Sequence, residues 1–257
     1  MAVNQPISLQ SGRIATEGDE LYYEVRGQGK PLILITGAGG DAGVYTSVAE
    51  ILADEYKVIT YDRRANGRST LHEPQNFEIS QQSRDVVAVL HAAGEDSAFI
   101  FGNSSGAVIA LDVAKTQPQA ARAVIAHEPP LARYHPKAKK WQHFYASVYL
   151  TAFQLGSAVA TLRFLFGTGL PVNEMIKASR QNLKQSDLGK EPRVDANRAA
   201  NVLMKDELLP VTNYLPDVAL IKHHGVKLFM AAGKQSLDKS AGMPRPPCSW
   251  RNNSAAL

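Results

Sequence analysis

The sequence predicts an α/β fold with a mostly parallel sheet flanked by helices, and two observations carry that prediction. Short apolar runs of strand length alternate with amphipathic runs of helix length through residues 1–130 of the 257-residue chain. Such alternation is typical of βαβ units, and wholly apolar strands are typical of a parallel sheet that is buried on both faces. The second observation is the pattern Gly102-x-Ser104-x-Gly106, which lies between an apolar strand and an apolar helix.

Residues 1–130 are expected to form the first part of the core. Residues 13–16 and 20–26 have alternating patterns and are joined at Gly18-Asp19, which predicts a hairpin. Further strands are expected at 31–36, 56–61, 98–101 and 123–126, and helices at 44–53, 80–93 and 107–116.

The second half of the chain is organised differently. Helical periodicity without strands runs from residue 131 to 210, which predicts an inserted helical cap. Residues 211–240 are expected to return to the core with one more strand at 225–232. Residues 241–257 contain Pro244, Pro246 and Pro247 and have no usable periodicity, so we expect a disordered tail there. Because no apolar strand follows, the C-terminal end of the core is predicted to be incomplete.

Composition argues against several classes of protein. The net charge is +4 and the basic residues are spread along the chain, so no nucleic-acid partner is expected. The apolar-rich stretch 147–166 is interrupted by polar residues, so no membrane span is expected. A polar N-terminus and a single cysteine, Cys248, favour a cytoplasmic location. No histidine, cysteine or carboxylate group has metal-ligand spacing, so no metal or other cofactor is expected.

Ser104 is the candidate nucleophile. In a G-x-S-x-G pattern the serine occupies a tight turn between a strand and a helix, so its hydroxyl projects above the sheet. The glycines on either side allow close approach of the backbone where a side chain would clash. The N–H groups at the start of the following helix point at the negative charge that develops when a carbonyl group is attacked.

Two further loops agree with this chemistry. Both follow predicted strands, and the carboxyl ends of parallel strands are where sites form in such sheets. The loops are Gly37-Ala38-Gly39-Gly40 and Asp62-Arg63-Arg64-Ala65-Asn66-Gly67-Arg68-Ser69.

With these three motifs in this order, the chain resembles an α/β-hydrolase of the cofactor-free esterase and lipase type over most of its length. The family loop D-x-R-G-x-G-x-S is matched with Ala65 in place of one glycine, and Thr36 stands where the family usually has a histidine. The resemblance implies that the backbone N–H groups of Ala38 and Ser105 form an oxyanion hole. It also implies that Ser104 forms an acyl-serine intermediate.

The activity implied by this resemblance is hydrolysis of an ester, lactone, thioester or similar acyl bond by a serine hydrolase. The expected partner is a small-molecule acyl substrate. Aromatic residues of the predicted cap indicate an apolar acyl group, and they are equally expected to pack the cap onto the core. These residues are Trp141, Phe144, Tyr145, Tyr149, Phe153, Phe164 and Phe166.

The acid of the catalytic triad has two candidates. After the strand at 225–232, Ser236 stands where the family commonly has an aspartate, and Asp238 follows two positions later. Glu128 is the other candidate, at the end of the strand at 123–126, where it is equally expected to cap a loop.

The base is the poorest match. In the family it follows a further strand, but no histidine follows Gly233 in this sequence. His127 is the candidate substitute base because it ends the strand next to that of Ser104. His72, His135 and His143 are weaker candidates, and for each of these histidines a surface or packing role is the better expectation.

Two other functions stay open at this point. Without its histidine, the chain is a candidate for a catalytically impaired α/β-hydrolase fold that binds a ligand. The turn Gly37-x-Gly39-x-x-Ala42, with Asp62 ending the next strand, also matches the dinucleotide pattern of an NADP-binding oxidoreductase. That minority interpretation leaves the pattern around Ser104 unexplained.

Overall fold

The computed structural model describes residues 8–70, 77–170 and 196–233, which form a seven-stranded sheet in the order β1-β2-β4-β3-β5-β6-β7. The β1–β2 and β2–β4 pairings are antiparallel, and all others are parallel. The predicted α/β fold with a mostly parallel sheet is therefore confirmed. The strands are β1 (Leu9–Thr16), β2 (Asp19–Arg26), β3 (Lys30–Ile35), β4 (Tyr56–Tyr61), β5 (Ala98–Asn103), β6 (Ala121–His127) and β7 (Lys227–Ala231).

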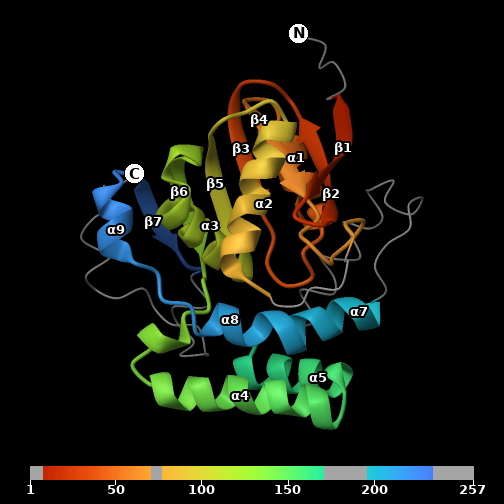
Figure 1. Ribbon diagram of the computed structural model, residues 1–257, viewed down its shortest axis with the longest axis vertical. Coiled ribbons are helices and arrows are strands. Elements are labelled where there is room, and N and C mark those ends of the chain that lie inside the picture. Colours follow the sequence, from red (N-terminus) through yellow and green to blue (C-terminus); the bar gives the residue numbers. More distant parts are fainter. Residues whose placement is uncertain (1–7, 71–76, 171–195, 234–257) are drawn as a thin grey trace.

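Helices flank both faces of the sheet (Figure 1). Leu34 and Val58 pack against helix α1 on one face. Their strand neighbours Ile33, Ile35 and Ile59 belong to the main core on the other face, because successive side chains of a strand alternate between faces. The helical elements beside the sheet are η1 (Ala42–Tyr45), α1 (Thr46–Leu52), α2 (Ile79–Ala92), α3 (Ser105–Thr116), η2 (Pro118–Ala120) and α9 (Val218–His223).

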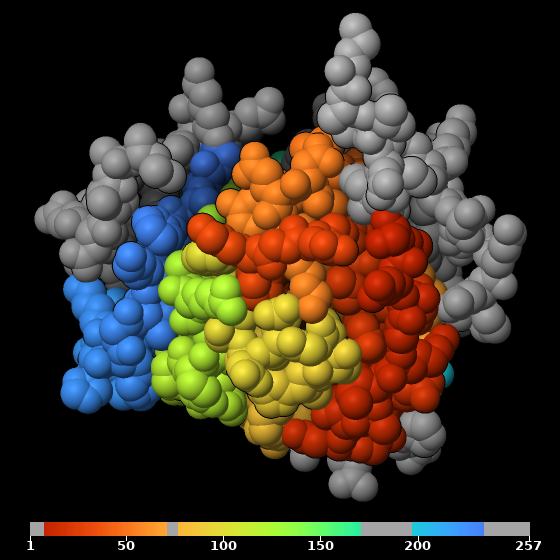
Figure 2. Space-filling view, turned by 90° about the horizontal axis from the view of Figure 1, so that it is seen from above, coloured from red at the N-terminus to blue at the C-terminus, as the bar shows by residue number. Residues whose placement is uncertain are grey.

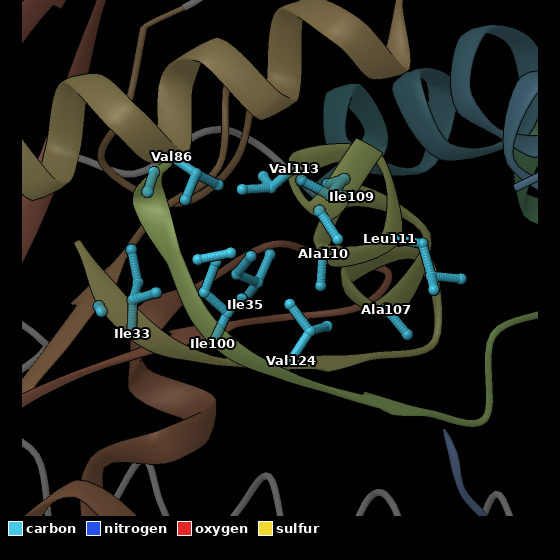
Figure 3. Packing of buried hydrophobic residues seen from close by; sticks show 14 of the residues in the cluster. Ile33, Ile35, Val86, Ile100, Ala107, Ile109, Ala110, Leu111, Val113 and Val124 are labelled. Carbon is cyan, nitrogen blue, oxygen red and sulfur yellow. The ribbon is translucent and has the colours of Figure 1, made fainter. Parts of the chain in front are cut away.

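The main core lies between the sheet and helices α2 and α3 (Figure 3). Ile35 and Ile100 of the sheet meet Val86 of α2 and Ile109 of α3, and each of these side chains is essentially inaccessible to solvent. Every residue of α3 from Ser105 to Ala114 is buried. A helix that is buried on all sides is stable only inside the protein, so packing on every face fixes the position of α3 against the sheet.

A helical layer covers the carboxyl end of the parallel strands, and we refer to it as the helical cap (Figure 1). It has its own hydrophobic cluster, in which Trp141, Tyr145 and Val148 pack with Ala160 and Met204. Its described elements are η3 (Ala132–Tyr134), α4 (Ala138–Gln154), α5 (Ser157–Thr168), α7 (Ala196–Asn201), the π-helical segment η4 (Val202–Glu207) and α8 (Leu208–Thr212).

The expected strands and helices of the core are all present, with shifted ends. The first strand begins at Leu9 rather than at residue 13. The segment expected as one helix at 44–53 starts as a 3-10 turn, because the side chain of Asp41 accepts a hydrogen bond from Gly43 N at 2.7 Å. The predicted tail at 241–257 lies outside the described residues.

The first and last described strands, β1 and β7, form the two opposite edges of the sheet. Seen from above, the N-terminal hairpin is on one side and β7 with α9 on the other (Figure 2).

Within the described ranges, no helix is long and apolar enough to cross a membrane. The same ranges contain no group of three or more histidine, cysteine or carboxylate residues that could hold a metal ion.

Candidate active site

Ser104 occupies a strained turn between β5 and α3. Its φ of 53° and ψ of −119° lie in a region that residues other than glycine rarely adopt. The Ser104 N–H donates to His127 O at 2.9 Å, and Ser104 O accepts from Ala107 N at 3.0 Å. The turn is therefore held by the neighbouring strand on one side and by the first turn of α3 on the other. No described residue forms a hydrogen bond with Ser104 Oγ.

Two glycines permit the close approach around this turn. A Cβ atom on Gly106 would lie 2.3 Å from Ile35 O, and one on Gly37 would lie 2.9 Å from Ser104 Cβ. Both distances are shorter than ordinary van der Waals contact, so neither position accepts a side chain without displacement of the backbone. The loop after β3 therefore lies directly against the candidate nucleophile.

The predicted oxyanion donors lie on these two contacting segments. Gly40 N donates to Gly37 O at 3.1 Å and closes the turn that presents Ala38. Ala38 is exposed, and its N–H donates to no backbone carbonyl among the described residues. Ser105 is the first residue of α3, where N–H groups have no acceptor within the helix. Both amides are thus free of helix or turn acceptors at the strand ends.

The loop after β4 is built around the buried carboxylate of Asp62. Asp62 Oδ1 accepts from Ala42 N at 2.7 Å and from Arg68 Nη2 at 3.0 Å. Asp62 Oδ2 accepts from Arg68 N and Arg68 Nε, both at 2.7 Å. These bonds occupy the roughly four lone-pair sites of a carboxylate. Asp62 therefore ties two loops together and has no acceptor site left for a ribose hydroxyl, which removes the basis of the dinucleotide interpretation.

A buried ion pair that sequence patterns did not single out joins this loop to the helical cap. Arg63 is fully buried, and its Nη2 lies 2.9 Å from Glu207 Oε1. The same nitrogen donates to Gly37 O at 2.8 Å and lies 3.4 Å from Ser105 Oγ. Arg63 thus contacts both segments that carry the candidate oxyanion donors. Glu207 ends the π-helical segment, a rare backbone form that is frequent at functional sites.

His127 lies beside Ser104 in the sheet, but its ring faces another partner. His127 Nδ1 is 2.7 Å from Asn103 Nδ2, and the ring stacks on Phe101 with 6.1 Å between centroids. With the Asn103 amide nitrogen as the donor, Nδ1 is the acceptor of this bond. The contact therefore occupies one ring nitrogen of His127 with Asn103 rather than with Ser104.

Glu128 connects the ends of β6 and β7. Its backbone has a φ of 51°, its N–H donates to Ala231 O at 2.9 Å, and its Oε1 accepts from Gly233 N at 2.9 Å. These contacts give Glu128 a structural role at the carboxyl edge of the sheet. The other candidate acid, Asp238, lies outside the described residues.

The other described histidines are exposed or contact their own segments. His91, His143, His223 and His224 are exposed. His135 Nδ1 accepts from Lys137 N at 2.9 Å, and its ring packs edge-on against Trp141. Partial burial lowers the pKa of His135, and the charges of Lys137 and Lys140 lower it further. His72 lies outside the described residues.

The aromatic residues of the helical cap mainly pack the cap itself. Trp141 and Tyr145 are buried in its hydrophobic cluster, with Phe144, Tyr149 and Phe164 against them. The two remaining residues of the predicted set are on the surface, since Phe153 is 59% exposed and Phe166 is 83% exposed. The packing role considered from the sequence therefore accounts for most of these side chains.

Comparison with known proteins identifies the class. The family model described as the alpha/beta hydrolase fold matches residues 30–161, which include both loops and the turn at Ser104. The chain therefore belongs to the α/β-hydrolase fold family.

Individual relatives agree with this assignment. An uncharacterized hydrolase of Bacillus subtilis strain 168, YraK, is 37% identical over 124 residues, which cover 48% of this chain and 46% of the relative. RutD of Azorhizobium caulinodans, which is provisionally named a carbamate hydrolase, is 36% identical over 41% of this chain and 39% of its own. The chain thus matches less than half the length of these curated relatives.

Solved structures share the fold. An α/β-hydrolase from Sphaerobacter thermophilus has a TM-score of 0.64 and 24% identity, with 87% of this chain and 82% of that chain covered. A thermophilic esterase from Thermogutta terrifontis has a TM-score of 0.65 and 20% identity, with coverages of 88% and 80%. At this level of identity the likeness extends to the fold alone.

Proposed function

We propose that this chain is a serine hydrolase that cleaves an ester, lactone, thioester or similar acyl bond through an acyl-serine intermediate on Ser104. The observation that carries the proposal is the strained turn of Ser104, which lies against the Gly37–Ala38 peptide at the carboxyl edge of the sheet. Strained backbone persists where the surrounding structure determines it, and it clusters at active sites. The named hydrolases among the relatives support the same class of reaction.

The proposed reaction proceeds in two steps. Ser104 Oγ attacks the carbonyl carbon of the substrate, and the N–H groups of Ala38 and Ser105 donate hydrogen bonds to the oxygen that becomes negative. The bond to the leaving alcohol or thiol then breaks, the leaving group takes up the proton released by the serine, and the acyl group stays on Oγ. Water next attacks the acyl carbon, which releases the acid and returns a proton to Ser104.

The proton-transfer residues are proposed separately. Glu128 or Asp238 is the acid that would orient a base, as expected from the sequence. His127 is the substitute base expected from the sequence, but its Nδ1 lies against Asn103 Nδ2, so we propose no base among the described histidines.

The proposed substrate is a small acyl compound that enters between the sheet edge and the helical cap. An apolar acyl group is the proposed preference, carried by the partly buried rings Phe144, Tyr149 and Phe164 rather than by the fully packed ones. The single cysteine in the chain fits a reducing compartment, and we propose the cytoplasm.

The second candidate function is a ligand-binding α/β-hydrolase fold without turnover. It is favoured by one observation, namely that no described histidine side chain forms a hydrogen bond with Ser104 Oγ. In that case the amides of Ala38 and Ser105 would hold a carboxylate or carbonyl oxygen of a ligand, and no covalent step would follow.

Incubation with a short-chain p-nitrophenyl ester separates the two functions. A serine hydrolase releases p-nitrophenol in a burst, gains the mass of one acyl group on the peptide that contains Ser104, and then turns over. An acylated protein that accumulates without turnover has a nucleophile and lacks the base for the second step. A folded protein that is never acylated, and whose unfolding temperature rises with an acyl ligand, has the binding function instead.

A further inference from the structure

The orientation of the peptide between Gly37 and Ala38 is fixed by two hydrogen bonds to its carbonyl oxygen. Gly37 O accepts from Arg63 Nη2 at 2.8 Å and from Gly40 N at 3.1 Å. A trans peptide unit is planar, and its C=O and N–H point in opposite directions. The two bonds to Gly37 O therefore also determine where the Ala38 N–H points. Hydrogen bonds in a chain polarise one another, so a bond to this carbonyl strengthens the Ala38 N–H as a donor.

Arg63 reaches the other candidate donor as well. Its Nη2 lies 3.4 Å from the hydroxyl of Ser105, and its own backbone N–H donates to Gly40 O at 2.7 Å. The Arg63 side chain thus contacts the Gly37–Ala38 peptide through Gly37 O and contacts Ser105 through its hydroxyl, and the Arg63 main chain holds the end of the Gly37–Gly40 turn.

The position of the guanidinium depends on the helical cap. Glu207 Oε1 and Oε2 lie 2.9 and 3.2 Å from Arg63 Nη2, and Glu207 is only 2% exposed. Arg63 Nε and Nη1 are buried and have no hydrogen-bond partner in the described part of the chain. Within residues 8–70, 77–170 and 196–233, Arg63 therefore makes its side-chain polar contacts through one nitrogen, and its charged partner there is Glu207 of the helical cap. A buried guanidinium without its carboxylate is costly, so it would move when Glu207 is removed.

We propose that Arg63 is a positioning residue for the Gly37–Ala38 oxyanion peptide, and that Glu207 couples the orientation of this peptide to the docked position of the helical cap. The catalytic meaning of this coupling rests on the proposed serine hydrolase function, while the structural coupling does not. Its consequence is that a cap displaced from the sheet edge withdraws Glu207 from Arg63 and turns the Ala38 N–H away from the oxyanion. The site is then fully assembled only when the cap is docked.

The test compares Glu207→Gln with Asp85→Asn as a matched control. Both changes convert a buried, arginine-paired carboxylate into an amide, but Asp85 pairs with Arg64, which makes no contact with Gly37. The first measurement is the amide resonance of Ala38 in protein labelled with ¹⁵N-alanine. We expect it to shift in Glu207→Gln and to stay unchanged in Asp85→Asn. Glu207→Asp keeps the charge at a shorter reach and is expected to give a smaller shift.

The second measurement is the kinetics of Ser104 modification by a fluorophosphonate, whose reaction also places negative charge on an oxygen. Glu207→Gln is expected to lower the maximal rate of modification by about ten- to a hundredfold. This decrease should not exceed the decrease in rate that follows removal of a whole oxyanion donor. The half-saturating probe concentration should not change, because probe binding precedes charge development. Glu207→Asp should recover part of the rate.

The two measurements separate the two claims. An Ala38 resonance that is unchanged in folded Glu207→Gln, or that shifts equally in Asp85→Asn, overturns the coupling whether or not Ser104 reacts. A specific Ala38 shift in a protein whose Ser104 never reacts supports the coupling and counts against the proposed hydrolase. If Glu207→Gln does not fold, Glu207→Asp alone carries the test, and an unchanged Ala38 resonance in that variant overturns the proposal.

Discussion

The two sides of the candidate site differ in how they are built. On the side of the amides, Ser104, the Gly37–Ala38 peptide and the loop that contains Asp62 hold one another through short contacts. On the side of proton transfer, the described residues offer Glu128, which ties β6 to β7, and His127, which faces Asn103. We therefore expect the proposed stabilisation of the oxyanion and the proposed transfer of the proton to be separable. Among the described residues, the groups proposed for the first lie within residues 1–130, apart from one contact with Glu207 of the helical cap.

The largest effect is expected from Gly106→Ala, which changes the packing around Ser104 and the candidate amide donors. The new Cβ would lie 2.3 Å from Ile35 O, so α3 must move away from β3. We expect the rate of Ser104 modification to fall by at least about a hundredfold and the free energy of unfolding to fall by roughly 1–3 kcal/mol. The measurements are fluorophosphonate labelling and urea denaturation.

A matched glycine control is available at Gly225. It has a φ of 73° with open space around it, so Gly225→Ala strains the backbone without a clash and far from Ser104. It should lower stability and leave the labelling rate unchanged. Equal losses of labelling in the two variants would show that labelling follows global stability rather than the geometry at Ser104.

The next effect concerns the buried carboxylate of Asp85, which pairs with Arg64 in the loop that contains Asp62. Burial raises the pKa of Asp85 to about 6, against the opposing effect of its hydrogen bonds with Arg64. Because the folded state holds this proton more tightly than the unfolded chain, the contribution of Asp85 is most favourable at low pH and is lost as the pH rises through about 6. The stability of the wild type minus that of Asp85→Asn should therefore fall by about 1–2 kcal/mol between pH 4 and pH 7. Urea denaturation across this range measures it, and a difference that grows with pH contradicts the assignment.

A smaller effect is expected at Glu128, on the proton-transfer side. Glu128→Ala removes the acceptor for Gly233 N and should cost about 1 kcal/mol of stability, whereas Glu128→Gln keeps an acceptor oxygen and should cost little. If Glu128 acts only as this connector, Glu128→Gln turns over p-nitrophenyl esters at the wild-type rate. A loss of turnover in Glu128→Gln with normal stability would make Glu128 the acid of the mechanism.

The smallest effect is expected for His127→Gln. Its ring contacts Asn103 and Phe101, and its Nδ1 is used as an acceptor. We expect the rate of Ser104 modification to change by less than about threefold, compared with the hundredfold or more that loss of a general base produces. A large decrease in the rate of Ser104 modification, with the far-UV circular dichroism unchanged, would place His127 in the mechanism. The amide side and the proton-transfer side would then not be separable.

Much of the amide side could be predicted from the sequence, because its parts are local. Glycines at 102 and 106 and apolar runs before and after Ser104 determine a strand, a turn and a helix that are adjacent in the chain. The contact between Arg63 and Glu207 could not be predicted, because the two residues are far apart in sequence and no pattern marks a π-helical segment. The contact between the His127 ring and Asn103 depends on the side-chain rotamer of His127, which could not be predicted from the sequence. Asp238 and His72 lie outside the described residues, so their roles stay predictions.

The most direct test of the central claim is labelling of the purified chain with a fluorophosphonate probe, followed by peptide mapping, with Ser104→Ala as the control. Ser104→Ala removes the nucleophile and changes no described hydrogen bond of its side chain. We expect the wild-type protein to carry the probe on Ser104 and folded Ser104→Ala to carry none. Labelling that persists in Ser104→Ala, or a folded wild-type protein that is never labelled, would contradict the claim that Ser104 is an activated nucleophile.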